Sequence, residues 1–328
     1  MDVSLTAHLL NMREPYVSSR TLAALATVVL STACNAAPTP DSPAGPVRTR
    51  HVLVIGIDGI RPDVLASVPT PNLDALAEAG AFSAEARTGF PTVSGPGWSS
   101  FLTGVWPDKH GVTDNTFSGS NYGAFPDFLT RIERAAPELA TFAAVDWTPL
   151  IDSLEGGRLV GDAVDVTVRL DGYELGWAEA DSAVVAASVL HLETADPNAM
   201  FVYLGNPDEA SHHAESIEEP YRQAIALADR HVGLLMDAVR ARPNYSSEDW
   251  LVVSSTDHGR LADGGHGGDS PEESTIYFLV SGAGVAPGSL EGAPSIVDVP
   301  LTAMAHVGIV ADSAWALDGR VVGIDPLR

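Results

Sequence analysis

Carboxylate and imidazole side chains gather in three short segments of this sequence, each rich in small residues and placed after an apolar run. The segments contain Asp58, then Asp208 with the neighbouring pair His212 and His213, then Asp257 and His258 followed by His266. Carboxylate oxygens and imidazole nitrogens are ligands of borderline metals such as zinc. Because at least six such groups are present, the sequence predicts two adjacent metal sites, each with room for a substrate oxygen.

A hydroxyl side chain, Ser94, stands between the first and second of these segments, at a point where a helix could begin. The N-terminus of a helix offers free amides and the positive end of a dipole, and both favour a bound phosphate. Helix capping is the alternative role for Ser94, and Thr92 and Ser99 are neighbouring hydroxyls. Together with two metal sites, a serine in this position is typical of a two-metal hydrolase with a serine nucleophile.

The elements that must position these residues alternate between strands and helices. Expected strands lie at 51–57, 141–145, 200–204, 250–254 and 275–280, and expected helices at 125–135, 177–194 and 218–240. Another helix is expected to begin at Pro71, with Thr70 as its capping residue. The alternation predicts an α/β fold with a doubly wound, mostly parallel central sheet flanked by helices. Asp58, Asp208 and Asp257 each come shortly after a strand, so we expect all three at one edge of that sheet.

Composition narrows the choice of partners. The 328 residues are 45% hydrophobic, which suits one large core. The formal charge of −25 argues against a nucleic-acid polymer as a partner, because a polyanion would be repelled. An acidic protein can still bind a small phosphate ester where metal ions dominate the local field, so a small substrate of this kind is expected.

Short motifs follow one another along the chain at 54–59, 70–73, 90–92, 103–107, 110–111, 114–115, 207–212, 257–259 and 266–267. In sequence and order they resemble the alkaline phosphatase superfamily and, within it, the nucleotide pyrophosphatase/phosphodiesterase (type I phosphodiesterase) family. The resemblance covers most of the chain from about residue 50 to 310. It implies an alkaline phosphatase-like core, two divalent metal ions with zinc the expected metal, and hydrolysis of phosphodiester or nucleotide pyrophosphate bonds.

The same resemblance assigns roles to the candidate residues. One ion is expected on Asp208, His212 and His266, and the other on Asp58, Asp257 and His258. The family pattern thereby favours His212 over its neighbour His213. Ser94 aligns with the family's nucleophilic threonine or serine, two residues beyond Thr92, which implies a covalent phospho-serine intermediate.

The phosphate-binding side of the expected site departs from the family. Gly97 stands where the phosphodiesterase family usually has an asparagine that binds a phosphoryl oxygen, three residues after Ser94. Backbone amides or Asn115 would have to replace that contact. Arg61 and Arg260 lie beside ligand loops, where each either binds phosphate or balances the carboxylates.

Aromatic residues are the remaining candidates for substrate contacts. Trp98, together with Phe90, Trp147 and Tyr173, is expected either to stack against a base or apolar leaving group or to pack in the core. Trp98 also stands where the sulfatase modification motif needs an arginine. Conversion of Ser94 to formylglycine is therefore not expected, and a sulfatase is only a minor interpretation.

The first 34 residues have the features of a targeting segment. Arg13 and Arg20 precede the apolar run 22–30, and small residues follow up to Cys34, with Met12 as an alternative start. Cys34, the only cysteine, resembles the lipid-modified cysteine of bacterial lipoproteins; simple cleavage and an incidental buried thiol are the alternatives. We expect residues 35–47 to be a flexible linker and 48–328 the catalytic domain.

These features predict an exported protein of the periplasm or cell envelope that meets the membrane only through an anchor at Cys34. Two further functions stay open beside the phosphodiesterase. One is a phosphomonoesterase of the same superfamily, and the other is a non-catalytic lipoprotein that binds metal or ligand.

Overall fold

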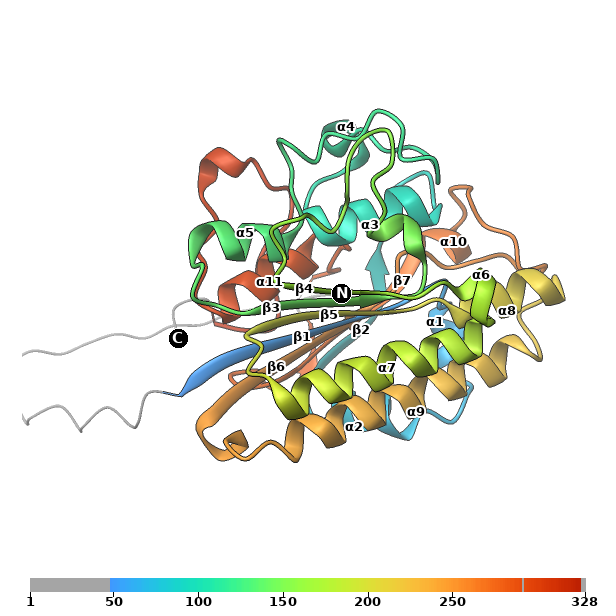
Figure 1. Ribbon diagram of the computed structural model, residues 1–328. Coiled ribbons are helices and arrows are strands. Elements are labelled where there is room, and N and C mark those ends of the chain that lie inside the picture. The colour runs from blue at the N-terminus through green and yellow to red at the C-terminus, as the bar shows by residue number, and fades with distance from the viewer. Residues whose placement is uncertain (1–47, 291, 326–328) are drawn as a thin grey trace, which may run out of the picture. The chain divides into compact units, whose positions relative to one another are not determined.

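The computed structural model describes residues 48–290 and 292–325 (Figure 1). The targeting segment 1–34, the linker 35–47 and the anchor at Cys34 lie outside these residues and stay predictions. None of the helices in the described part of the chain combines the length and apolarity that a membrane crossing needs.

A single eight-stranded sheet forms the centre of the fold, with strand order β4-β3-β5-β1-β6-β7-β2-β8. Its strands are β1 (Thr49–Ile57), β2 (Ala81–Arg87), β3 (Thr141–Val145), β4 (Val166–Arg169), β5 (Ala199–Leu204), β6 (Glu248–Ser255), β7 (Thr275–Gly282) and β8 (Gly288–Ser289). The five strands from β4 to β6 run parallel, whereas β7 is antiparallel to both β6 and β2. The predicted mostly parallel, doubly wound sheet is confirmed.

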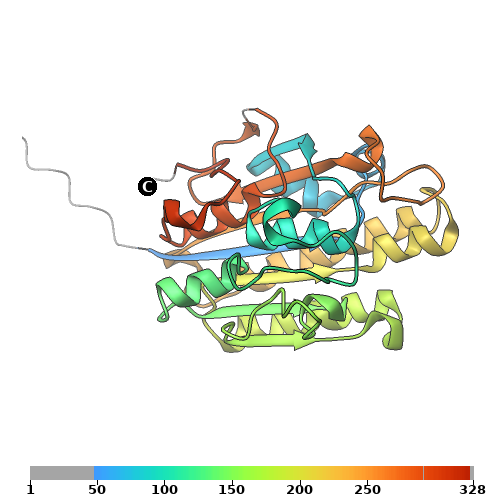
Figure 2. The same cartoon turned by 90° about the horizontal axis from the view of Figure 1, so that it is seen from above.

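Helices cover both faces of this sheet, as Figures 1 and 2 show. The helices are α1 (Pro62–Leu65), α2 (Pro71–Ala79), α3 (Ser94–Thr103), α4 (Pro107–His110), α5 (Phe128–Ala135), α6 (Gly172–Leu175), α7 (Trp177–Thr194), α8 (Asn206–Ala214), α9 (Tyr221–Arg240), α10 (Pro271–Ser274) and α11 (Asp298–His306). Short 3-10 turns lie at Thr148–Leu150, Tyr245–Ser247 and Ser313–Trp315. In Figure 1, α2, α7 and α9 lie below the sheet, and α3, α5 and α11 lie above it.

The alternation of side chains along β1 divides the core into two layers. Val52 and Val54 face the cluster that contains α3, α5 and α11, while Leu53 and Ile55 face the cluster of α2, α7 and α9. Because both faces are covered, the strand is apolar on both sides, as parallel strands usually are. The central strands are therefore readable from sequence as continuous apolar runs.

Two local expectations need correction. Thr70 occupies the N-cap position of α2, but its hydroxyl donates to the Asp74 carboxylate at 3.2 Å and makes no capping bond to the helix backbone. The strands β2, β4 and β8 were not expected at all. They are short or polar strands near the sheet edges, and β4 is largely exposed, so no apolar run marks them.

Candidate active site

Three adjacent parallel strands bring the predicted acids to one edge of the sheet. Asp58 follows β1 directly, Asp208 lies in the first turn of α8 after β5, and Asp257 comes two residues after β6. Since β1 pairs with β5 on one side and with β6 on the other, their carboxyl ends are neighbours. The expected convergence of these carboxylates is observed.

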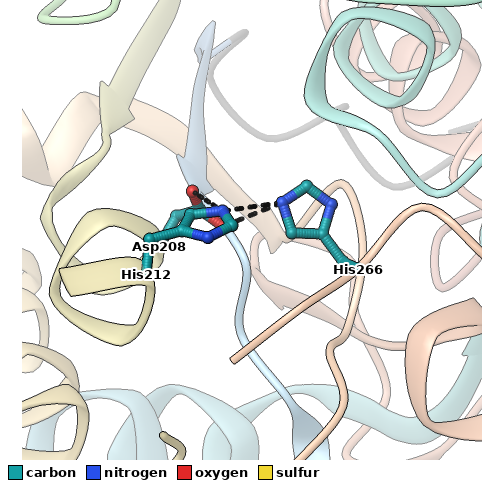
Figure 3. A group of neighbouring side chains, drawn as sticks. All are labelled: Asp208, His212 and His266. Atoms are coloured by element: carbon teal, nitrogen blue, oxygen red, sulfur yellow. Dashed lines mark hydrogen bonds and ion pairs between the residues drawn. The ribbon is translucent and has the colours of Figure 1, made fainter. Parts of the chain in front are cut away.

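The first group of possible metal ligands consists of Asp208, His212 and His266, whose ligand atoms lie within 4.8 Å of one another. Figure 3 shows the two imidazole rings pointing toward each other, with Nε2 of His212 2.8 Å from Nε2 of His266. His212 Nε2 is also 3.3 Å from Asp208 Oδ2. Two ring nitrogens this close require a proton or a cation between them, which suits a metal position.

The orientation of His266 is set by the Ser94 loop. Its Nδ1–H donates to the backbone carbonyl of Thr92 at 2.8 Å, so the lone pair of Nε2 is directed into the group. The Thr92 hydroxyl donates to the Gly268 carbonyl at 2.7 Å and accepts from the Gly267 amide at 3.0 Å. Thr92 therefore holds the histidine loop, and its hydroxyl is not available as a nucleophile.

Helix α8 decides between the two neighbouring histidines. Asp208 and His212 are one turn apart and so lie on the same face of the helix. The side chain of His213 is 77% exposed and lies 4.0 Å from Glu209, away from the group. The structure thus brings His212, and not His213, to Asp208 and His266.

The second group consists of Asp58, Asp257 and His258, all of them buried. His258 Nδ1–H donates to the Gly259 carbonyl at 2.8 Å, which leaves Nε2 to face Asp257 Oδ2 at 3.3 Å and Asp58 Oδ1 at 3.6 Å. These two carboxylate oxygens are buried yet have no hydrogen-bond partner among the described residues. Buried oxygens without donors fit a bound cation, and this donor set suits zinc.

The crowded carboxylates perturb one another. Burial, and then the charge of Asp208, raises the pKa of Asp58 to about 7. Burial followed by Asp58 and Asp208 raises the pKa of Asp257 well above its usual range. Burial and His266 lower the pKa of His258, so its imidazole is neutral and able to act as a ligand. The protein atoms alone leave an excess of negative charge here.

Arg260 balances part of that charge. It is fully buried, its Nε donates to the Gly59 carbonyl and its Nη1 to the Gly264 carbonyl, both at 3.0 Å, and its Nη2 donates to Asp208. Burial alone would raise the pKa of Asp208, but the Arg260 guanidinium holds it well below its usual range. Of the two roles left open for this arginine, the structure shows charge balance.

Ser94 is the first residue of α3, and its Oγ lies 3.3 Å from His258 Nε2. Its side chain lines the cleft that the two groups share. Ser99, the other neighbouring hydroxyl, is fully buried and donates to the Gly95 carbonyl at 2.6 Å. Among the three hydroxyls considered, Ser94 alone faces both candidate metal groups.

Two of the residues expected on the substrate side are not there. Trp98 has 0% of its surface exposed and packs between Phe101 and Tyr203, so it cannot stack against a ligand. Gly97 is also buried, and a Cβ added to it would lie 2.9 Å from Cβ of Asp257. The helix turns both positions toward the core, and the close approach of Asp257 explains why no side chain fits at Gly97.

Trp98 instead acts on a candidate ligand. Its indole Nε1–H donates to Asp58 Oδ2 at 2.9 Å, and the hydroxyl of Tyr203 donates to the same oxygen at 2.5 Å. These two donors occupy Oδ2 and leave Oδ1 directed at His258. Sequence reasoning missed this role, since no local pattern tells which face of α3 carries the indole.

Asn115 does line the cleft, as expected. Its Oδ1 accepts a hydrogen bond from the Gly95 amide at 2.7 Å, and the Gly97 amide donates to the Val93 carbonyl at 2.9 Å. The amides of Gly95 and Gly97 are therefore already bonded and cannot replace the missing asparagine. The side-chain Nδ2 of Asn115 remains as the donor beside Ser94.

The cleft has a volume of about 200 Å³, and beyond the ligand groups its wall includes Trp147, Tyr173, Trp177 and Glu209. Trp147 and Tyr173 are thus the expected aromatic residues that the structure brings to the site, whereas Phe90 is 66% exposed and lies outside it. No lysine or arginine is among the described residues that line this cleft.

Arg61 and His110, the two other basic residues in or beside the short sequence motifs, bind neighbouring residues and do not line the cleft. Arg61 forms an ion pair with Asp63 at 2.7 Å and does not line the cleft. His110 is buried, its Nδ1 accepts from the Val112 amide at 3.1 Å, and its Nε2 lies 3.0 Å from Ser100 Oγ. It holds its loop against α3, and burial lowers its pKa to about 4.

Comparisons with known proteins find similar sequences and similar folds. Residues 52–139 match the family model for type I phosphodiesterase/nucleotide pyrophosphatase. Ectonucleotide pyrophosphatase/phosphodiesterase family member 3 of Rattus norvegicus is 24% identical over 69% of this chain and 26% of its own length. Family member 7 of Mus musculus is 24% identical over 65% of this chain and 51% of its own. The chain thus matches about a quarter to a half of the length of these curated relatives.

Solved structures show the same fold. Murine ectonucleotide pyrophosphatase/phosphodiesterase 5 superimposes with a TM-score of 0.63 at 16% identity, covering 80% of this chain and 96% of that one. A 2-O GAG sulfatase superimposes with a TM-score of 0.65 at 13% identity, covering 83% of this chain and 73% of that one.

The chain therefore shares its fold with an ectonucleotide pyrophosphatase/phosphodiesterase and with a sulfatase. In sequence the chain is similar to the type I phosphodiesterase/nucleotide pyrophosphatase family, and the resemblance predicted from its motifs is confirmed.

Proposed function

We propose that this protein is a metal-dependent phosphodiesterase or nucleotide pyrophosphatase that works through a covalent phospho-serine. The observation that supports this most directly is the position of Ser94, whose Oγ lies 3.3 Å from His258 Nε2 in the cleft shared by both candidate ligand groups. Neither Thr92 nor Ser99 offers a hydroxyl that is free for attack. The family resemblance points to the same chemistry.

The ligand assignment is part of this proposal. Asp208, His212 and His266 would hold one divalent ion, and Asp58, Asp257 and His258 the other. Zinc suits both donor sets, since each combines carboxylate oxygen with imidazole nitrogen. When bound, such ions favour ionisation of the Ser94 hydroxyl and neutralise charge on the phosphoryl group and the leaving oxygen.

The chain's own residues perform the remaining steps. Ser94 Oγ attacks phosphorus, so that an Oγ–P bond forms and the bond from phosphorus to the leaving oxygen breaks. Water then attacks the phospho-serine, which releases the phosphorylated product and regenerates the Ser94 hydroxyl. Asn115 donates from Nδ2 to a non-bridging oxygen, because its Oδ1 is already bonded to the Gly95 amide.

The wall of the cleft favours a diester over a monoester. A monoester dianion carries one charge more than a diester and needs an additional cation, yet no lysine or arginine is among the described residues that line the cleft. Glu209 adds a further carboxylate there, while the exposed ring of Tyr173 offers a surface for a base or an apolar leaving group. An inactive variant of murine ectonucleotide pyrophosphatase/phosphodiesterase 5 was solved with AMP, which is consistent with a nucleotide-sized ligand.

The test compares hydrolysis of bis-p-nitrophenyl phosphate and p-nitrophenyl phosphate by the zinc-loaded protein, with Ser94→Ala as the control. We expect faster cleavage of the diester and its loss in Ser94→Ala while zinc binding is kept. A preference for the monoester would identify a phosphomonoesterase. Turnover close to wild type in Ser94→Ala would refute the covalent route, and no turnover with two ions bound would favour the non-catalytic alternative.

A further inference from the structure

Two buried carboxyl groups face each other beside the active site and have no role in the chemistry above. Asp146 directly follows β3, Asp181 lies on α7, and both have 0% of their surface exposed. Both groups border the turn at Gly205, whose amide donates to Asp181 Oδ1 at 2.9 Å, and a Cβ added to Gly205 would lie 3.0 Å from Asp146 Oδ1. Both oxygens of Asp146 and Oδ2 of Asp181 have no donor among the described residues.

Two ionised carboxylates buried against the same turn would repel each other. Each would be only an acceptor, and burial would remove the water that normally screens their repulsion. One proton shared between them replaces this repulsion with an O–H···O hydrogen bond and leaves the pair with a single negative charge. We propose that Asp146 and Asp181 hold one proton between them and act as a positioning pair for helix α8.

The connection to α8 runs through the turn after β5. Asp181 Oδ1 accepts hydrogen bonds from the Gly205 amide at 2.9 Å and the Asn206 amide at 3.3 Å, where α8 begins. A Cβ on Gly205 would lie 3.0 Å from Asp146 Oδ1 and 2.5 Å from the Trp177 ring, so this turn is enclosed on both sides. The remaining negative charge lies at the helix N-terminus, where it is favourable.

This arrangement fixes two of the candidate ligands. Asp208 follows Asn206 by two residues, and His212 lies one turn further along α8. A displacement of the first turn would move both side chains relative to His266, which is held by a different loop. The predicted effect on metal binding depends on the proposed function, because it assumes that Asp208 and His212 are metal ligands. The proposal of a shared proton does not depend on that function.

The surrounding groups favour the protonated pair. Burial, then Asp181, and more weakly the charge of Asp58 after β1, raise the pKa of Asp146 well above its usual range. Burial raises the pKa of Asp181 to about 6. Tyr203 of β5 also faces Asp146, and burial together with Asp58 and Asp146 raises its own pKa, so it stays neutral.

The sign of the pH dependence follows. Between the unfolded carboxyl pKa of about 4 and the raised native pKa, the native pair binds more protons than the unfolded chain does. The contribution of the pair to stability is therefore present at low pH and is lost as the pH rises through this range. An uncharged amide in place of Asp146 would remove that loss.

The test is the unfolding temperature of Asp146→Asn and of wild type from pH 4 to pH 8, both with a chelator present. Asparagine is isosteric, cannot ionise, and donates from Nδ2 to Asp181. We expect the unfolding temperature of the variant, relative to that of wild type, to increase as the pH rises. At pH 8 the variant should unfold at the same temperature as wild type or at a higher one. A variant that is destabilised equally at every pH would overturn the shared proton.

Asp298→Asn is the matched control. Asp298 is also buried, but its two oxygens accept from the amides of Ser295 and Arg320, both at 2.8 Å. In Asp298→Asn, the side-chain Nδ2–H would face a backbone amide that also donates. We therefore expect the control to be destabilised at every pH from 4 to 8, with no rise in its stability relative to wild type at pH 8.

A second measurement tests the positioning of α8. Asp181→Leu removes the acceptor for the Gly205 and Asn206 amides, and we expect zinc affinity to fall roughly tenfold or more. Asp181→Asn keeps an acceptor oxygen and should restore most of that affinity. Wild-type affinity in Asp181→Leu would refute the positioning role. These tests measure unfolding temperature and zinc affinity. A negative result in them can therefore be told apart from a failure of the proposed function, which would appear as absent diester hydrolysis.

Discussion

Removal of one hydroxyl, in Tyr203→Phe, should weaken zinc binding at the group of Asp58, Asp257 and His258. The Tyr203 hydroxyl donates to Asp58 Oδ2 at 2.5 Å. A hydrogen bond to a charged group contributes about 1.5–3 kcal/mol. At about 1.4 kcal/mol per factor of ten, its loss corresponds to a roughly ten- to hundredfold lower affinity. Trp98 still donates to the same oxygen at 2.9 Å, so the site should not be lost entirely.

The assay is a competition between the protein and a chelator for zinc at one fixed pH. Tyr277→Phe is the matched control, because Tyr277 is also fully buried and its hydroxyl lies 2.8 Å from Ser254 Oγ, away from the ligand groups. Both variants should lose stability, but only Tyr203→Phe should lose affinity. Equal affinity in the two variants would refute the inference that Tyr203 orients Asp58 as a ligand.

Three further changes test other parts of the site. Arg260→Gln leaves Asp208 buried without its cation, so urea denaturation of the chelated protein should show a loss of about 3–5 kcal/mol in unfolding free energy. Gly97→Ala places a Cβ 2.9 Å from Cβ of Asp257, and this overpacking should cost about 1–3 kcal/mol in denaturation and also lower zinc affinity. His213→Ala should leave diester turnover unchanged in a steady-state assay, since that side chain is 77% exposed and lies away from both groups; a large loss would contradict the assignment.

The central fold was predictable because its signals are local. The strand 141–145 and the helix 177–194 were expected with the bounds that β3 and α7 have. The four strands expected at 51–57, 200–204, 250–254 and 275–280 were each placed within a few residues. In contrast, β2 and β4 carry exposed polar residues, and their strand conformation depends on pairing with β7 and β3 across the sheet. Pairing between strands that are far apart in the chain produces no regular pattern of apolar and polar residues, so these strands could not be predicted from the sequence.

The candidate site was predictable to the extent that each side chain follows an element directly. Asp58 and Asp257 come after central strands, so the topology alone brings them together. Of the two roles left open for Trp98, the structure shows packing in the core; the sequence could not choose between them, because the orientation of the indole depends on how α3 packs against the sheet. Asp146 follows β3 as Asp58 follows β1, and that position was an available signal; its partner Asp181 lies inside a helix that nothing in the sequence connects to it.

The charge of the site gives an independent reason to expect diester selectivity. With neutral histidines, the ligand carboxylates Asp58, Asp208 and Asp257 and the guanidinium of Arg260 sum to −2. Two divalent ions would bring the sum to +2, and an ionised Ser94 with a diester monoanion would bring it to zero. A monoester dianion would leave −1 in a cleft that already contains the Glu209 carboxylate and whose described lining includes no lysine or arginine. Unbalanced charge is costly where water is excluded, so the monoester should bind and react more slowly than the diester. Faster hydrolysis of p-nitrophenyl phosphate than of the diester would contradict this reasoning. It would mean that a positive charge other than Arg260 and the two metal ions binds the monoester.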